Sequence, residues 1–146
     1  MFKVKECTNY DQAKELFVEY SKLKGAEQCF VSFDHELKNI ETVYPNGQIL
    51  IATYDDVPIG CIAVKAISST KCELKRLYLK EEFRGKGYAK FLFEGILNRA
   101  RELGFLEAEI HTLPEIMPIG YQMYLNYGFK EKGKDEGGAV LLTISL

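Results

Sequence analysis

The sequence lacks a surplus of charge of either sign. Nineteen lysine and arginine residues stand against twenty-one aspartate and glutamate residues, which gives a formal net charge of −2 at pH 7. A protein that neutralises nucleic-acid phosphates needs a marked basic excess. The composition therefore predicts that the protein has no nucleic-acid partner.

A long apolar segment is also missing from the start of the chain. Residues 1–20 are repeatedly interrupted by charged side chains, and they contain no apolar run of the length that a signal peptide or a membrane span requires. We therefore expect a cytoplasmic protein with no membrane partner.

Cysteine pairs of the kind that mark metal or redox sites are absent too. The four cysteines, at positions 7, 29, 61 and 72, lie far apart and form no C-x-x-C motif. They predict no metal site and no redox motif. The simplest interpretation is that they are buried or incidental thiols in a reducing compartment.

What the chain does have is enough apolar material for one core. Its 146 residues are 47% hydrophobic and 12% aromatic, and this length is common for a single domain. No fixed-period repeat and no low-complexity tract divides the sequence. We expect one domain over residues 1–146.

The spacing of apolar residues changes along the chain and predicts alternating strands and helices. Strand spacing is found at residues 2–7, 48–53, 58–64, 72–79, 106–110 and 139–146. Helical spacing is found at residues 11–25, 33–44, 89–103 and 118–128. The order predicts a mixed α/β fold in which each helix covers a face of a sheet.

A glycine-containing turn stands between a strand and the best-defined helix, at Arg84-Gly85-Lys86-Gly87-Tyr88-Ala89. Several backbone N–H groups are unpaired at such a place, and the helix dipole adds positive potential, so an anion is expected there. Gly85 and Gly87 let a bulky pyrophosphate approach the backbone, and Arg84 and Lys86 add positive charge. A purely structural turn with solvated basic residues would have the same sequence.

Two familiar phosphate motifs do not fit this turn. It lacks the G-x-x-x-x-G-K-[ST] spacing of a P-loop. It also lacks the third glycine of the dinucleotide motif G-x-G-x-x-G, because Lys90 occupies that position. A different phosphate-containing ligand is therefore expected.

The turn resembles the [RQ]-x-x-G-x-[GA] signature of the GNAT superfamily of acetyltransferases. Upstream, Pro58-Ile59-Gly60-Cys61 is similar to the P-x-G-x segment of the family's third strand. Downstream, Tyr124-Leu125-Asn126-Tyr127-Gly128-Phe129 is similar to its Y-x-x-x-G-F ending. The three motifs occur in the family's order and span about residues 50–130.

The resemblance implies a GNAT-like fold, with a central, mixed, mostly antiparallel sheet of about seven strands flanked by about four helices. It implies acetyl-CoA as the co-substrate and no metal. The fourth strand is implied to splay from the fifth so that pantetheine can bind the strand's backbone, and the turn is implied to hold the pyrophosphate. The implied cofactor-binding residues are Leu77, Tyr78, Leu79, Arg84, Gly85, Lys86, Gly87, Tyr88 and Ala89. The side chain of Tyr88 could equally be a packing residue.

The family's chemistry is the direct attack of a neutral amine on the thioester, followed by protonation of the departing thiolate. The Y-x-x-x-G-F match implies that Tyr124 is the general acid, and an ordinary core tyrosine is the alternative. Glu73 is the first candidate for the general base, and a solvated strand residue is the alternative. His111 is the second candidate for the base, although relatives often have aspartate there and a structural histidine is the alternative.

The acceptor implied by the resemblance is a primary amine of a small molecule or peptide. Phe30, Phe33, Asp34 and Glu36 could line a pocket for a small cationic amine, or the acidic residues could form a solvated helix face. Two other functions stay open, namely an acyl-CoA-binding sensor without turnover and a structural domain whose glycine turn binds nothing. Relatives are often dimers, which leaves a homodimer open.

Overall fold

A computed structural model of the protein describes residues 1–23, 25, 30 and 32–146. Its centre is a seven-stranded sheet with the strand order β1-β2-β3-β4-β5-β7-β6. Only β4 and β5 pair in parallel, and all other neighbours are antiparallel, so the predicted mixed, mostly antiparallel sheet is confirmed. The strands are β1 (Phe2–Glu6), β2 (Ile49–Tyr54), β3 (Val57–Ala66), β4 (Lys71–Leu79), β5 (Glu107–Thr112), β6 (Lys130–Lys134) and β7 (Val140–Ser145).

Five α-helices accompany the sheet in the described residues, where about four were expected. The difference arises because residues 33–44 form two short helices, separated at Asn39, instead of one. The Asn39 side chain donates a hydrogen bond to the carbonyl oxygen of His35 at 2.9 Å, and such local bonds compete with helix continuation. The helices are α1 (Tyr10–Ser21), α2 (Phe33–Lys38), α3 (Ile40–Val43), α4 (Tyr88–Glu102) and α5 (Pro118–Asn126), with a 3₁₀ turn, η2, at Glu81–Phe83. Among the described residues, no helix is long and apolar enough to cross a membrane.

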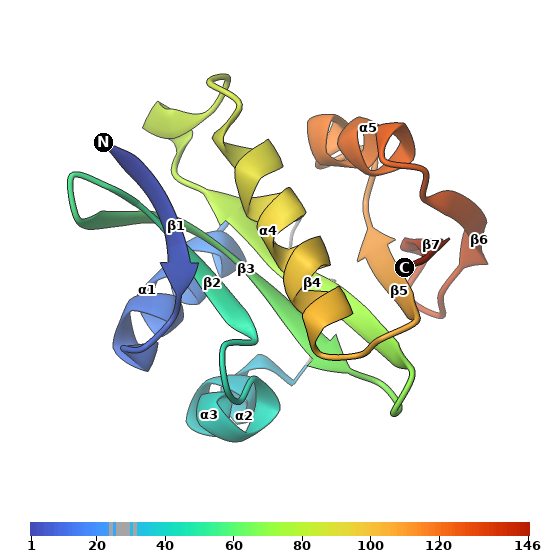
Figure 1. Cartoon of the computed structure of the whole chain (residues 1–146). Coiled ribbons are helices and arrows are strands. Elements are labelled where there is room, and N and C mark those ends of the chain that lie inside the picture. Colours follow the sequence, from blue (N-terminus) through green and yellow to red (C-terminus); the bar gives the residue numbers. More distant parts are fainter. Residues whose placement is uncertain (24, 26–29, 31) are drawn as a thin grey trace.

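The helices cover both faces of the sheet (Figure 1). Helix α4 contacts β2, β3 and β4, and its residues Leu92, Phe93 and Ile96 are fully buried against one face. Helix α1 contacts β3 and β4, and its residues Leu16 and Phe17 belong to a separate buried cluster. Each face of the sheet thus has its own apolar core.

Several helix ends lie where the sequence predicts them. Asn9 caps α1, because its side chain accepts a hydrogen bond from the N–H of Asp11 at 3.0 Å. Pro118 is the first residue of α5. Gly104 and Gly128 follow the ends of α4 and α5 with φ values of 91° and 101°, a conformation that glycine adopts without steric cost.

The sheet opens between β4 and β5. Parallel pairing joins Lys71–Glu73 of β4 to Glu107–Glu109 of β5 and stops there. At Arg76 the backbone of β4 is left-handed, with φ of 63°, and the register with β3 shifts, which defines a β-bulge. The Cys61 thiol donates a hydrogen bond to the Arg76 carbonyl at 3.2 Å. The splay that the family resemblance implied is therefore present.

Steric contact requires a glycine at residue 60 in the Pro58–Cys61 segment. A Cβ atom on Gly60 would lie 2.7 Å from the carbonyl oxygen of Tyr78, which is far closer than a carbon and an oxygen can pack. Strands β3 and β4 approach each other beside the bulge only because residue 60 has no side chain.

The cysteines in the described residues are structural thiols. Cys7, Cys61 and Cys72 are buried and form no disulfide. Burial, with the charge of Glu109 nearby, raises the pKa of Cys72 to about 12, so this thiol stays protonated. Cys29, which was expected to behave in the same way, lies outside the described residues.

Candidate active site

The turn before α4 has an open backbone. Gly87 is the N-cap residue of α4, and no side chain caps this helix, so the N–H groups of its first turn have no intrahelical partner. Gly85 and Gly87 have φ values of 78° and 82°. Nothing lies within 4 Å of the position that a Cβ atom would take on either glycine. An anion can therefore reach the backbone of the turn.

The basic side chains of the turn fold back onto the protein. The Arg84 Nε donates a hydrogen bond to the carbonyl oxygen of Leu79 at 2.8 Å, which ties the turn to the end of β4. The Lys86 Nζ lies 5.9 Å from the centroid of the Phe83 ring. Both side chains are exposed and leave positive charge beside the turn.

Tyr88 and Ala89 form the first turn of α4. The Tyr88 ring stacks on Phe2 of β1 with a centroid distance of 4.1 Å and an interplanar angle of 4°. Its side chain is thus a packing residue, which is one of the two roles that the sequence left open. The backbone N–H groups of Tyr88 and Ala89 belong to the uncapped first turn.

A small cavity of about 30 Å³ lies in the gap where β4 leaves β5. Its walls come from Leu74–Leu77 of β4, from Ile110–Leu113 at the end of β5, and from Tyr124 of α5. Tyr78 and Leu79, which were predicted to bind the cofactor through their backbone, pair with β3 on their other side. Of the predicted strand end, Leu77 therefore lines the same cavity as Tyr124, whereas Tyr78 and Leu79 do not.

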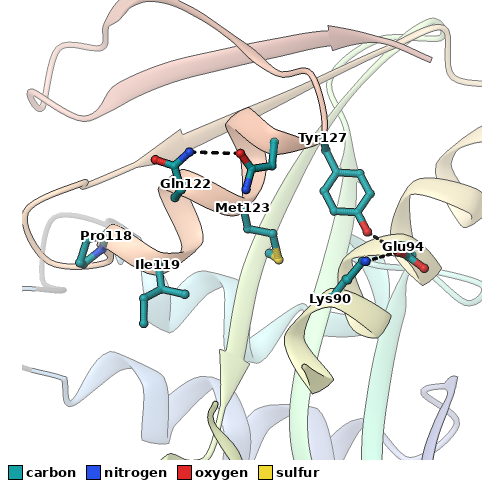
Figure 2. Close-up of a pocket in the computed structure, with 8 residues that line it drawn as sticks. Lys90, Glu94, Pro118, Ile119, Gln122, Met123 and Tyr127 are labelled. Atoms are coloured by element: carbon teal, nitrogen blue, oxygen red, sulfur yellow. Dashed lines mark hydrogen bonds and ion pairs between the residues drawn. The ribbon is translucent and has the colours of Figure 1, made fainter. Parts of the chain in front are cut away.

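A larger groove of about 730 Å³ lies between α4 and α5 (Figure 2). Lys90 and Glu94 of α4 face Met123 and Tyr127 of α5 across it. The Tyr127 hydroxyl donates a hydrogen bond to Glu94, and the Lys90 Nζ lies 3.9 Å from the same carboxylate. The sequence analysis missed this groove, because its walls come from two helices far apart in the chain and no motif marks them.

Tyr124 is almost entirely buried at the edge of the gap. Its side chain packs against Phe93, with a centroid distance of 5.1 Å, and against Phe129, with a centroid distance of 6.3 Å. A Cβ atom on Gly120 would lie 3.5 Å from the phenol oxygen, so the missing side chain at residue 120 leaves room beside the hydroxyl. The ring is fixed by packing, and its hydroxyl lies beside Gly120.

A second cavity, of about 430 Å³, lies on the opposite face of the sheet. Glu73, Leu74–Arg76 and His111 line it from the sheet, and Asp135–Gly137 line it from the turn between β6 and β7. Leu74–Arg76 and His111 also line the small cavity in the gap. The two cavities thus share a wall at the place where β4 and β5 separate, and Glu73 lies on the side away from the α4–α5 groove.

His111 is clamped between two carboxylates. Its Nε2 lies 2.6 Å from Glu109, and its Nδ1 lies 2.8 Å from Asp135. Burial disfavours the charged imidazolium, but the hydrogen bonds to Asp135 and Glu109 outweigh this effect and raise the pKa of His111. Both ring nitrogens are thus engaged by carboxylates. This geometry favours the structural role that the sequence left open for His111 over the role of second candidate base.

Glu36 does not offer a free charge to a cationic amine, so that expectation is wrong. Its carboxylate accepts hydrogen bonds from Arg76 Nε at 2.8 Å and Nη2 at 2.6 Å, and from the Tyr44 hydroxyl at 3.1 Å. The Phe30 ring centroid lies 4.2 Å from the Arg76 guanidinium carbon. Asp34, on the same helix, is exposed. The buried pair fixes α2 against the bulge of β4.

Comparison with known proteins shows the family. The model of the acetyltransferase (GNAT) family matches residues 11–129, which includes the turn, the splayed strands and Tyr124. The chain belongs to the GNAT family. It is therefore an acyltransferase by family, and the predicted GNAT resemblance is confirmed.

Several known proteins are similar to most or all of the chain. An uncharacterized N-acetyltransferase of Schizosaccharomyces pombe is 32% identical over 131 residues, which cover 87% of this chain and 80% of the relative. The crystal structure of an acetyltransferase from Streptococcus agalactiae has a TM-score of 0.80 at 21% identity and covers 99% of this chain and 98% of its own. The PaiA N-acetyltransferase of Thermoplasma acidophilum, solved with coenzyme A, has a TM-score of 0.73 at 23% identity and covers 100% of this chain and 99% of its own.

The GNAT site described above contains no cluster suited to a metal ion. Within residues 1–23, 25, 30 and 32–146, no group of three or more histidine, cysteine, aspartate or glutamate side chains could hold one.

The clamp around His111 predicts a pH-dependent contribution to stability. Because the pKa of His111 is raised in the folded state, the clamp stabilises the fold fully below the ordinary value of 6.5, and this stabilisation is lost as the pH rises through the higher folded value. We expect His111→Gln to lower the free energy of unfolding by about 1–2 kcal/mol at pH 5.5, and by progressively less towards pH 9. Urea denaturation of both proteins across this range measures the difference.

A matched control is available in α2. His35 is exposed, and its ring contacts the Asn39 side chain but no carboxylate of a described residue. His35→Gln should therefore give a small difference that does not change with pH in this way. A difference for His111→Gln that is constant from pH 5.5 to 9 would show that the ring does not change its charge over this range.

Proposed function

We propose that the protein is an N-acetyltransferase that transfers an acetyl group from acetyl-CoA to the primary amine of a small molecule or peptide. The observation that supports this most is the gap between β4 and β5. Cofactor-sized space lies on one side of it, between α4 and α5, and a polar cavity lies on the other side. The two ligands can thus approach a common point from opposite faces of the sheet.

We propose that acetyl-CoA occupies the α4–α5 face. The open backbone of Arg84–Ala89 suits the pyrophosphate, because the helix dipole and the uncapped N–H groups attract a dianion. The edge of Leu77–Leu79 that no longer pairs with β5 offers backbone groups to the amides of pantetheine, apart from the Leu79 carbonyl, which Arg84 occupies. The thioester would then reach the gap beside Tyr124. The similar PaiA N-acetyltransferase has coenzyme A bound, which supports this cofactor.

The chemistry proposed for the gap is a direct transfer. The neutral amine attacks the thioester carbonyl, a C–N bond forms, and the C–S bond breaks as the tetrahedral intermediate collapses. Tyr124 donates its phenolic proton to the departing thiolate, and Glu73 accepts the proton that the amine loses, through a water molecule. Glu73 then releases its proton to solvent and Tyr124 takes one up from solvent, so both groups return to their starting states and the enzyme is unchanged after each cycle.

A function as a sensor without turnover is not favoured. The related proteins are named N-acetyltransferases, and Tyr124 lines the cavity in the gap where the proposed transfer takes place. One continuous sheet spans the chain, which supports the proposal that residues 1–146 form a single domain.

The proposed function is tested by calorimetric titration with acetyl-CoA, followed by an assay of thiol release with a panel of amines. We expect micromolar binding and release with at least one amine class. Gly87→Asp should weaken acetyl-CoA binding at least tenfold, because it places a carboxylate where the pyrophosphate lies and strains a backbone of positive φ.

Gly104→Asp is the matched control for backbone strain. Gly104 also has a positive φ, of 91°, and also has nothing within 4 Å of its Cβ position, but it lies at the far end of α4. The Gly104→Asp variant should lose stability as Gly87→Asp does, but it should keep its affinity for acetyl-CoA. Equal affinity in the two variants would refute the assignment of the turn, and no binding by the wild-type protein would refute the function.

A further inference from the structure

The cavity on the face opposite α4 is lined by charged side chains of both signs. Three of the six, Arg76, His111 and Asp135, are already paired inside the protein, whereas Glu73, Lys75 and Glu136 are not in an ion pair with a described residue. Arg76 is paired with Glu36, and His111 is paired with Glu109 and Asp135. These groups shape the cavity but have little charge left for a ligand.

Among the basic side chains in the cavity walls, Lys75 differs because it has no ion-pair partner among the described residues. It is partly buried and lines both this cavity and the small one in the gap. Within the described part of the chain, no carboxylate lies within ion-pairing distance of its ammonium group. A cation that is withdrawn from water without a partner is costly, so a ligand that brings an anion would be stabilised there.

The electrostatics of Lys75 agree with this geometry. Burial lowers the pKa of Lys75, and the nearby charge of Glu73 only partly offsets that effect. An anion bound beside the ammonium group would offset the free-energy cost of burying this charge. The cavity is therefore built to gain free energy from a ligand with a negative group at this position.

Glu73 lies two residues before Lys75 and lines the same cavity. Residues at this spacing lie on one face of a strand, about 6.5 Å apart along it. Glu73 makes no hydrogen bond or ion pair with a described side chain. A negative and a positive group thus stand side by side, and a small ligand with an ammonium group and a carboxylate a few bonds apart would match both.

We infer that the acceptor is a small amino acid whose amine faces Glu73 and whose carboxylate binds Lys75. This inference rests on the proposed acetyl transfer and names the class of acceptor. The cavity of about 430 Å³ has room for a side chain as well as for the two charged groups. In this binding mode, Lys75 is the residue that distinguishes amino acids from simple amines.

The experiment compares each acceptor in three forms at saturating acetyl-CoA. Glycine, leucine, phenylalanine and γ-aminobutyrate are each assayed for thiol release beside the corresponding amide and the decarboxylated amine. The amide has a less basic nitrogen and the amine a more basic one, so together they bracket the effect of basicity. We expect kcat/KM for the best amino acid to exceed that of both counterparts without a carboxylate at least tenfold.

Three variants assign the preference to one side chain. Lys75→Met should lower kcat/KM for the best amino acid at least tenfold, mainly through KM, and change kcat/KM for its amide less than twofold. Lys75→Arg, which keeps the charge, should retain most of the preference. Lys65→Met removes an exposed lysine from the neighbouring strand, at the position paired with Glu73, and should behave as the wild type.

Each outcome of these assays either supports or overturns the inference. An amide or amine that reacts as well as its amino acid would overturn the inference and leave the acetyltransferase function standing. An equal loss for amino acid and amide in Lys75→Met would also overturn it, because Lys75 would then act in another way. The absence of thiol release with all three forms would count against the proposed function itself, and the inference would fall with it.

Discussion

Replacing Tyr124 by phenylalanine is expected to lower the turnover number roughly 100-fold or more, which is the usual contribution of a positioned general acid. The substitution removes only the phenolic hydroxyl. The contacts of the ring with Phe93 and Phe129 remain, and the turn at Arg84–Ala89 is not touched. Acetyl-CoA affinity, measured by calorimetry, should therefore stay within about twofold, well under 1 kcal/mol.

Tyr121→Phe is the matched control, one turn earlier on the same helix. The Tyr121 hydroxyl faces Glu131 at 3.4 Å and does not line the gap. Its loss should leave turnover unchanged. Turnover of Tyr124→Phe equal to that of Tyr121→Phe would remove Tyr124 from the proposed mechanism. A fall in turnover with an equal fall in the free energy of unfolding would assign it a packing role instead.

The second large effect concerns stability. Glu36→Ala should lower the free energy of unfolding by about 3–5 kcal/mol, because it leaves the Arg76 guanidinium buried without its bidentate partner. The Arg76 side chain is only 3% exposed, so water cannot replace the lost carboxylate without a rearrangement. For a chain of this length, such a loss should lower the melting temperature by roughly 10 °C.

Two further variants test whether the loss comes from the unpaired charge. Asp34→Ala, on the same helix but exposed, should change stability by less than about 0.5 kcal/mol. The double variant Glu36→Leu with Arg76→Met removes both charges and should recover part of the stability. A double variant that is less stable than Glu36→Ala would show that the arginine contributes favourably even when its partner is absent.

The parts of the site that the sequence predicts are those encoded locally. The turn before α4 is specified by two glycines and by the start of a helix, all within six residues, and Tyr124 stands in a short motif that ends at Gly128. Local backbone requirements of this kind can be inferred from the order of residues alone. The same holds for six of the seven strands and for the ends of α4 and α5. The sequence did not locate β6, because its residues are all exposed and none is apolar.

The parts that the sequence did not predict depend on contacts between distant segments. Glu36 and Arg76 are forty positions apart, and nothing near either residue indicates that they pair. The break of the second helical segment depends on one side-chain hydrogen bond of Asn39. The isolation of Lys75 is also a property of the folded chain, because it follows from which carboxylates are already engaged by Arg76 and His111.

The bulge of β4 has a consequence for how such an enzyme can diversify. Because the opening passes through the sheet, the walls of the α4–α5 groove and the turn at Asp135–Gly137 belong to different segments on different sides. In the proposed arrangement neither ligand blocks the entry of the other, so the order of addition need not be fixed. Under this proposal, changes in the short β6–β7 hairpin would alter the choice of acceptor while the groove and turn proposed to hold the donor are inherited intact.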